Sequence, residues 1–177
     1  MTFPPGDLRR IVLHWTAGDY RTLSPSYHVC VALDARDRPV ARQTHDLRAN
    51  MRDTREPGMA YAAHTSGRNA YAIGIAICAM RDATPHDFGR YPLRPGAIAL
   101  ACETAARLAA FYAIPVDREH VATHAEHALA DGYFGCGDDE RWDVARLEPS
   151  PDPLQPDDAR RAGDRLRGMI RACLPGS

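Results

Sequence analysis

Two histidines in the chain each follow a segment that is expected to form a buried strand. Ile11-Val12-Leu13 leads into His14, and residues 116–123 lead into His124. Asp143 lies further along and adds a carboxylate. Two histidines and one carboxylate are the ligands of many catalytic zinc sites, in which an open fourth position allows water to be activated for attack on a carbonyl. By spacing alone the indication is weak, because a single histidine at a strand end is more often a core residue.

The elements that would carry these residues can be outlined from hydrophobic periodicity. We expect strands at 11–13, 27–33, 39–43, 72–79 and 116–123, and helices at 95–112 and 157–172. The polar segments 44–60 and 125–142 are expected to be loops, and residues 150–153 are expected to interrupt regular secondary structure. The small residues that alternate within 72–79 should leave room on one face of that strand. Alternating strands and helices favour the α/β class, and the length of 177 residues suits a single domain spanning 1–177.

Composition excludes several classes of protein. The formal net charge is −1, which gives no general attraction to nucleic acid or membranes. All 22 basic residues are arginine, a side chain that keeps its proton at any working pH. The five cysteines are scattered without a CxxC pair, so neither a disulfide framework nor a cysteine zinc cluster is expected, and Cys30, Cys78 and Cys102 are expected in the core.

The first residues contain no apolar signal core, and no apolar run approaches membrane-spanning length. We therefore expect a protein made in the cytoplasm without a signal peptide and without membrane insertion. Any action outside the cell would need another route of release.

Several ordered motifs between residues 8 and 147 are similar to those of one enzyme family. They are Ile11-Val12-Leu13-His14-Trp15-Thr16-Ala17, Ser26-Tyr27-His28-Val29, Ala63-His64-Thr65 with Asn69 and Ala72-Ile73-Gly74-Ile75, Thr123-His124-Ala125-Glu126, and Arg141-Trp142-Asp143. In these motifs the chain resembles the zinc-dependent N-acetylmuramoyl-L-alanine amidases, a family shared by bacteriophage endolysins, bacterial cell-wall amidases and peptidoglycan-recognition proteins. The resemblance implies a central mixed β-sheet flanked by helices, a zinc ion in a groove, and hydrolysis of the amide between muramic acid and L-alanine.

The resemblance also implies roles for individual residues. His14, His124 and Asp143 match the three zinc ligands. The third ligand is Asp in some members and Cys in others, so Cys136 is an alternative to Asp143. Tyr27 matches a tyrosine that points at the reacting water, and Arg141 stands where the family often has lysine, a position suited to stabilising an oxyanion. Each has a structural alternative: Tyr27 as a core aromatic, and Arg141 in a surface salt bridge.

The chain departs from some family members at the general base. Ala76 stands where those members carry a glutamate on the central strand. Glu126 is the nearest substitute by sequence, either as a base or as a residue that orients a ligand. His127 is expected to be a solvated loop histidine. His28, next to Tyr27 along a strand, is expected on the opposite face with a packing role.

Four further residues are candidates for substrate binding. The resemblance places His64, Thr65 and Asn69 beside the zinc, where they could bind glycan or peptide; the alternative is a loop anchored by side-chain hydrogen bonds. Trp15 could form a platform for sugar or a wall of the core.

These features favour a monomeric zinc hydrolase acting on peptidoglycan, such as a phage or prophage endolysin that reaches the cell wall after release by holin-type lysis or a secretion system. Two alternatives stay open. One is a module of the same fold that binds peptidoglycan without cutting it, and the other is an amidase that recycles soluble muropeptides.

Overall fold

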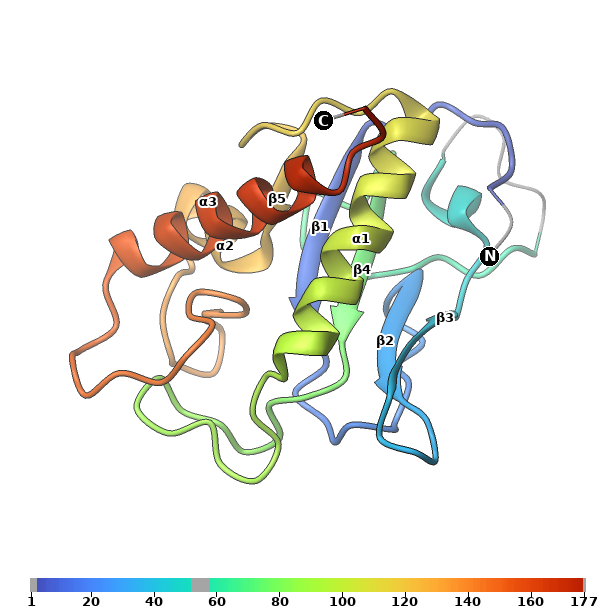
Figure 1. The fold of residues 1–177 in the computed structure, drawn as a ribbon. Helices are drawn as coiled ribbons and strands as arrows, with labels where there is room; N and C mark the ends of the chain where they lie inside the picture. The colour runs from blue at the N-terminus through green and yellow to red at the C-terminus, as the bar shows by residue number, and fades with distance from the viewer. Residues whose placement is uncertain (1–2, 52–57, 177) are drawn as a thin grey trace.

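A mixed five-stranded sheet forms the centre of the protein. The structure, a computed structural model, describes residues 3–51 and 58–176. The strands are β1 (Arg10–Trp15), β2 (Val29–Leu33), β3 (Pro39–Gln43), β4 (Ala72–Ile77) and β5 (Val121–Thr123), arranged in the order β3-β2-β4-β1-β5 (Figure 1). Only β2 and β3 pair antiparallel; the other neighbours are parallel. The expected α/β architecture with a central mixed sheet is therefore confirmed.

Helices α1 (Pro95–Tyr112) and α3 (Pro156–Ala172) lie side by side over one face of this sheet (Figure 1). Both were expected from periodicity, and each begins with proline, whose fixed φ suits the first helical turn. The shorter α2 (His124–Asp131) follows β5 and contacts α3. A 3-10 turn, η1 (Leu47–Asn50), lies in the segment expected to be irregular. Among the described residues, no helix is long and apolar enough to cross a bilayer.

The two faces of the sheet differ in side-chain size. Ile11 and Leu13 of β1 align with Ile73 and Ile75 of β4, and these residues pack with α1 in the main hydrophobic core. The other face of β4 carries the small residues Ala72, Gly74 and Ala76, as the alternating pattern predicts. Ala76 is in register with His14. The space above these small residues holds the histidine side chains described below.

Gly74 leaves room for the ring of His64. A Cβ atom at position 74 would lie 2.6 Å from His64 Cγ and 2.7 Å from its Cδ2. We therefore expect Gly74→Ala to lower the free energy of unfolding by about 1–3 kcal/mol through overpacking. Gly168→Ala is the control: a Cβ there meets nothing within 4 Å, and alanine is the better helix former, so stability should rise by up to about 1 kcal/mol. Urea denaturation would compare them, and equal stability of the two variants would contradict this account.

Several boundaries differ from the sequence prediction; for example, the strand expected at 72–79 ends at Ile77. The strand expected at 116–123 is confined to Val121–Thr123, because the Asp117 carboxylate accepts the backbone N–H groups of Glu119 and His120 and forms a turn. The strand expected from Tyr27 begins at Val29. The expected loop at 125–142 was wrong for its first part, which is α2. Residues 52–57 of the long segment 44–60 lie outside the described residues.

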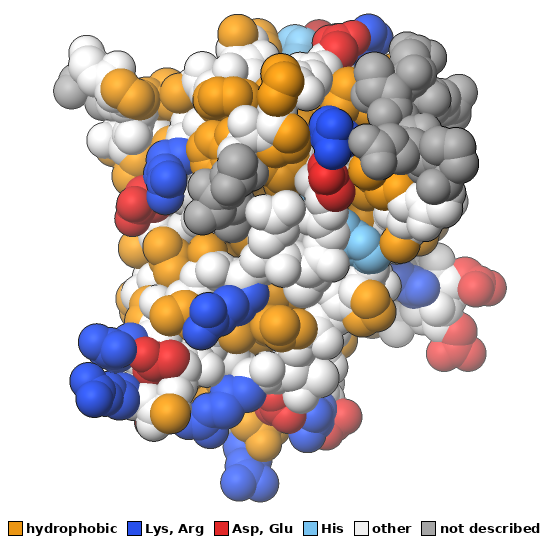
Figure 2. Space-filling model, turned by 90° about the vertical axis from the view of Figure 1, so that its right-hand side faces the viewer, with side chains coloured by type: hydrophobic (Ala, Val, Ile, Leu, Met, Phe, Trp, Pro, Cys, Tyr) orange, Lys and Arg blue, Asp and Glu red, His pale blue; other side chains and the backbone are white. Residues whose placement is uncertain are grey.

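Charged side chains of both signs share the surface. On the face shown in Figure 2, arginine side chains gather at the lower left with acidic side chains between them. Many of the ion pairs of the described residues join exposed arginines to aspartates, such as Arg21 with Asp37 and Arg38 with Asp34. This mixture agrees with the near-zero net charge.

Candidate metal centre and active site

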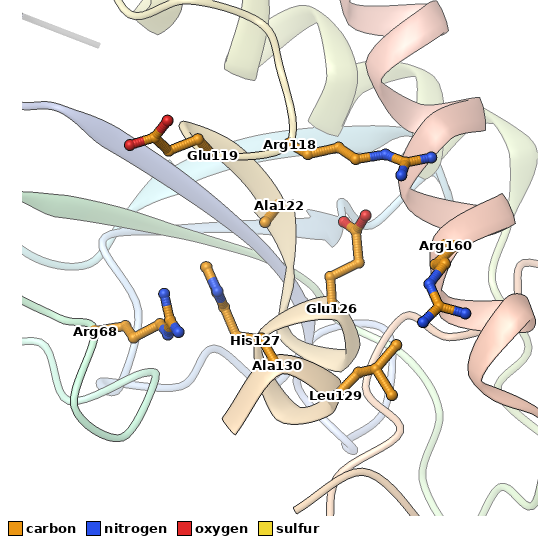
Figure 3. A pocket seen from close by; sticks show the side chains of 9 residues that line it. All are labelled: Arg68, Arg118, Glu119, Ala122, Glu126, His127, Leu129, Ala130 and Arg160. Atoms are coloured by element: carbon orange, nitrogen blue, oxygen red, sulfur yellow. The ribbon is translucent and has the colours of Figure 1, made fainter. Parts of the chain in front are cut away.

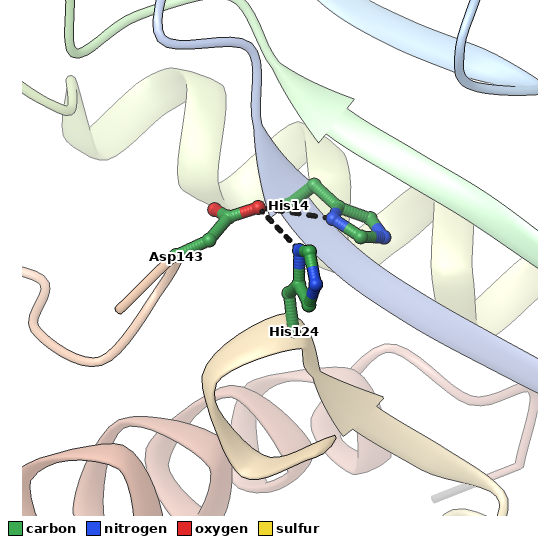
Figure 4. A group of neighbouring side chains, drawn as sticks. All are labelled: His14, His124 and Asp143. Atoms are coloured by element: carbon green, nitrogen blue, oxygen red, sulfur yellow. Dashed lines mark hydrogen bonds and ion pairs between the residues drawn. The ribbon is translucent and has the colours of Figure 1, made fainter. Parts of the chain in front are cut away.

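His14, His124 and Asp143 come together in one buried group (Figure 4). His14 Nδ1 lies 3.0 Å from Asp143 Oδ2, and His124 Nδ1 lies 3.2 Å from the same oxygen. One ligand atom from each residue fits within a mutual distance of 4.8 Å. The three residues are separated by up to 129 positions in the chain, so tertiary folding alone makes them neighbours.

The two histidines meet because they lie at the carboxyl ends of parallel neighbouring strands. His14 is near the carboxyl end of β1, and His124 directly follows β5 as the first residue of α2. Parallel strands place their carboxyl ends at the same edge of a sheet, where sites commonly form. The group therefore lies at the end of the β1–β5 pair.

Backbone hydrogen bonds fix the third member of the group. The N–H of Trp15 donates to Asp143 Oδ1 at 2.7 Å, which leaves Oδ2 facing the histidines. The N–H of Ala125 donates to the Asp143 carbonyl at 2.8 Å. The next residue, Val144, has φ of 63°, a left-handed conformation that is rare for a β-branched side chain and is often found at functional sites.

The donor set fits a zinc ion. Burial by itself would raise the pKa of Asp143, but hydrogen bonds from His124 and His14 outweigh it and lower the pKa, so the carboxylate is ionised. Burial lowers the pKa of His14 and favours the neutral imidazole, the form that binds metals. His14 Nε2 lies 3.2 Å from His64 Nδ1 and 3.4 Å from Thr65 Oγ1. A metal-binding histidine usually donates its other N–H to such an acceptor.

A cavity of about 640 Å³ opens beside this group. Its lining residues are Ser26, Tyr27, Ala63, His64, Thr65, Ser66, Asn69, His124, Tyr133, Asp139 and Arg141. The Tyr27 ring lies 4.9 Å from that of His14, and its hydroxyl donates to the Trp15 carbonyl at 3.1 Å. Burial, and then the charge of Asp143, raise the pKa of Tyr27. The phenol therefore stays protonated and acts as a hydrogen-bond donor.

Comparison with known proteins identifies the family. Residues 4–140 match the model of the N-acetylmuramoyl-L-alanine amidase family. The chain belongs to this family. Two solved structures of PlyL are also similar: one, of the protein itself, is 17% identical with a TM-score of 0.49, covering 97% of this chain and 86% of the other. The second, of a PlyL mutant, is 16% identical with a TM-score of 0.47, covering 94% and 86%. No curated protein matches.

Arg141 lines the cavity beside the ligand group. Its guanidinium donates to the backbone carbonyls of Asp138 at 3.0 Å and Glu140 at 2.5 Å. The expected alternative, a salt bridge to one of the neighbouring carboxylates, is not among the ion pairs of the described residues. The side chain is exposed, so its charge can reach a ligand in the cavity.

His64, Thr65 and Asn69 line the cavity and also shape it. Asn69 Oδ1 accepts the backbone N–H groups of His64 at 3.0 Å and Thr65 at 2.7 Å, which matches the loop-anchoring alternative. His64 and Thr65 are buried behind His14. The ring of His28 adjoins that of His64, with the ring centroids 5.6 Å apart. His28 Nδ1 accepts the N–H of Gly74 at 3.0 Å, in keeping with a packing role.

Two candidate residues lie outside the cavity. Trp15 is 6% exposed and packs edge to face on Trp142, so the prediction of a sugar platform was wrong and Trp15 is a wall of the core. Glu126 also points away from the ligand group, because its carboxylate binds Arg167 and the backbone of Thr123. The prediction of Glu126 as a base that reaches the reacting water is thereby corrected. Cys136 is exposed and lies outside the buried group of donors.

Other residues of the site were missed in the sequence. Tyr133 lines the cavity with a buried hydroxyl that has no protein partner, and Asp139 is a carboxylate of the lining. No sequence motif marks either one.

His127 was expected in solvent but is buried on α2. The sequence did contain a signal for this helix, because Thr123 and Glu126 have the spacing of a capping box.

Buried neutral histidines should make stability depend on pH. Burial lowers the pKa of His28 to about 3 and that of His127 to about 4. In the unfolded chain both have a pKa near 6.5, so between about pH 4 and 6.5 unfolding takes up protons and the free energy of unfolding falls as pH falls. Each histidine contributes up to about 1.4 kcal/mol per pH unit near pH 5.

Urea denaturation at several pH values would measure this slope. His127→Gln removes one titrating group and should make the slope shallower by about one proton. His86→Gln, at an exposed histidine, should leave it unchanged. A slope near pH 5 that is the same in His127→Gln and the parent protein would contradict the expectation.

Proposed function

We propose that this chain is a zinc-dependent N-acetylmuramoyl-L-alanine amidase that hydrolyses the amide between N-acetylmuramic acid and L-alanine in peptidoglycan. One observation carries the proposal: a buried His14–His124–Asp143 group adjoins a cavity lined by Tyr27 and Arg141. Membership of the amidase family supports the same reaction. His14 Nδ1, His124 Nδ1 and Asp143 Oδ2 would hold the metal.

A zinc ion held there would supply Lewis-acid polarisation of the scissile carbonyl and activation of the water that attacks it. The protein contributes fixed hydrogen-bond donors and charge. The Tyr27 hydroxyl, which donates to the Trp15 carbonyl in the structure, would turn from that carbonyl and donate to the oxygen on which negative charge develops. The guanidinium of Arg141 adds a positive charge at the same cavity. Arginine does not give up its proton, so Arg141 acts by electrostatics alone.

The site lacks the central-strand glutamate that some family members carry. Ala76, in register with His14, offers no such group, and Glu126 faces α3. Among the described residues that line the cavity, Asp139 is the one carboxylate. In the proposed mechanism, Tyr27 and Arg141 are the side chains that stabilise the developing negative charge.

Mass spectrometry of digestion products tests the reaction. Purified sacculi are incubated with the zinc-loaded protein, and the products should carry a free lactyl carboxylate on muramic acid and a free amino group on L-alanine. Cleavage of a glycosidic or a different peptide bond would contradict the proposal. Sedimentation with sacculi without cleavage would favour the peptidoglycan-binding module, and cleavage of soluble muropeptides but not sacculi would favour the recycling enzyme.

We also propose a lytic role on the cell wall, with peptidoglycan as partner and a monomer as the active form. Loss of turbidity of a sacculus suspension would support the lytic role. Size-exclusion chromatography with light scattering would test the monomer, and activity confined to an oligomeric fraction would contradict it.

A further inference from the structure

We propose that α3 positions two of the three candidate metal ligands through two buried arginine–carboxylate pairs. Arg167 of α3 pairs with Glu126 beside His124, and Asp158 of α3 pairs with Arg146 beside Asp143. The helix lies beyond residues 4–140, the part of the chain that matches the family model. The inference rests on the proposed zinc function and adds a role for a helix that contributes no ligand.

The first pair holds the beginning of α2. Arg167 is 2% exposed, and its guanidinium donates to both carboxylate oxygens of Glu126, at 2.9 Å and 2.7 Å. Glu126 Oε2 also accepts the backbone N–H of Thr123 at 2.9 Å, while Thr123 Oγ1 accepts the N–H of Glu126 at 3.1 Å. His124 lies between these two residues as the first residue of the helix. The bidentate pair therefore fixes the turn that aims the His124 ring.

The packing of α3 is fitted to this carboxylate. A Cβ atom at Gly163 would overlap the carboxyl carbon and both carboxylate oxygens of Glu126. Glycine is a poor residue inside a helix, and here its missing side chain lets the Glu126 carboxylate lie against the α3 backbone. In Figure 3 the Glu126 side chain rises from the start of α2 beside α3. Arg167 and Gly163, both on α3, thus both adjoin the Glu126 carboxylate.

The second pair holds the turn that follows Asp143. Arg146 is 7% exposed, and its guanidinium donates to Asp158 Oδ2 through Nε at 3.0 Å and a terminal nitrogen at 2.6 Å. It also donates to the carbonyls of Pro85, Asp152 and Pro153. Asp158 is the third residue of α3 and forms a capping box with Gln155. The arginine thus joins the Asp143 turn to the beginning of α3.

The two held segments also meet each other. The backbone N–H of Ala125 donates to the Asp143 carbonyl, and His124 Nδ1 lies 3.2 Å from Asp143 Oδ2. A shift of either segment changes the separation of these two ligand atoms. Because metal affinity depends strongly on such geometry, α3 should set zinc affinity as well as stability.

The test uses the double variant Glu126→Gln/Arg167→Met. Glutamine keeps the capping interaction with Thr123, and the paired substitution leaves no uncompensated buried charge. We expect zinc affinity, measured by competition with a chelator, to fall about tenfold. The visible spectrum of the cobalt-substituted protein should change, and kcat should fall with KM unaltered. Arg165→Gln on the same helix, which breaks an exposed pair with Glu148, should match the parent protein in all three measurements.

Separate results would overturn the two proposals. A folded double variant with parental zinc affinity and cobalt spectrum would overturn this inference and leave the proposed function intact. Absence of zinc binding in the parent protein would overturn the proposed function and this inference with it. If the double variant does not fold, Arg167→Lys replaces it: lysine keeps the charge but loses the bidentate geometry, and a zinc affinity equal to that of the parent would overturn the inference.

Discussion

Replacement of Asp143 by alanine is expected to abolish tight zinc binding and to lower kcat/KM on peptidoglycan by about 10³-fold or more. The carboxylate is the one anionic member of the ligand group, and it faces both histidines through Oδ2. Loss of several kcal/mol of metal-derived transition-state stabilisation corresponds to this factor. Zinc content after dialysis, measured by atomic absorption, and turbidity of a sacculus suspension would report the two effects.

Two further variants separate metal binding from folding. Asp143→Asn keeps an oxygen for the N–H of Trp15 but removes the charge, so it should fold like the parent and still lose zinc. Cys136→Ser tests the alternative third ligand and should keep both zinc and activity, because Cys136 is exposed and outside the ligand group. Full zinc content in Asp143→Ala together with loss of zinc in Cys136→Ser would transfer the ligand role to the cysteine.

Tyr27→Phe is expected to lower kcat by about 10²–10³-fold with little change in KM. Burial raises the pKa of the phenol, so it stays protonated beside His14 at the cavity. In the proposed mechanism its hydroxyl turns from the Trp15 carbonyl to the developing oxyanion, and the substitution removes this donor. The ring that packs against His14 is retained. Zinc affinity and stability should therefore stay near the parent values, and steady-state kinetics on a soluble muropeptide would separate kcat from KM.

Tyr20→Phe is the matched control for this substitution. The Tyr20 hydroxyl donates to the Pro92 carbonyl at 3.0 Å and is not part of the cavity lining, so its removal should leave kcat unchanged. An equal kcat for Tyr27→Phe and the parent protein would mean that Tyr27 only supports the core. A large increase in KM with constant kcat would instead assign it to substrate binding.

Local pattern in the sequence determined much of the fold. The apolar segments that became β1, β3 and β4 and the helical spacing of α1 were readable, because buried strands and amphipathic helices need distinct periodicities. The alternation of small residues in β4 predicted the open face on which the histidines lie. The family motifs indicated His14, His124 and Asp143 as one group, which the structure brings together.

Only the tertiary structure decided which side chains reach the cavity. Glu126 and His124 are two positions apart, but the turn of α2 sends one to Arg167 of α3 and the other to Asp143. Trp15 follows His14 directly and points into the core. Neighbours in sequence diverge in this way because helix and strand geometry aim successive side chains in different directions. Arg167 of α3 binds Glu126, and Arg146 in the turn after Asp143 binds Asp158 of α3. Local sequence does not encode these contacts.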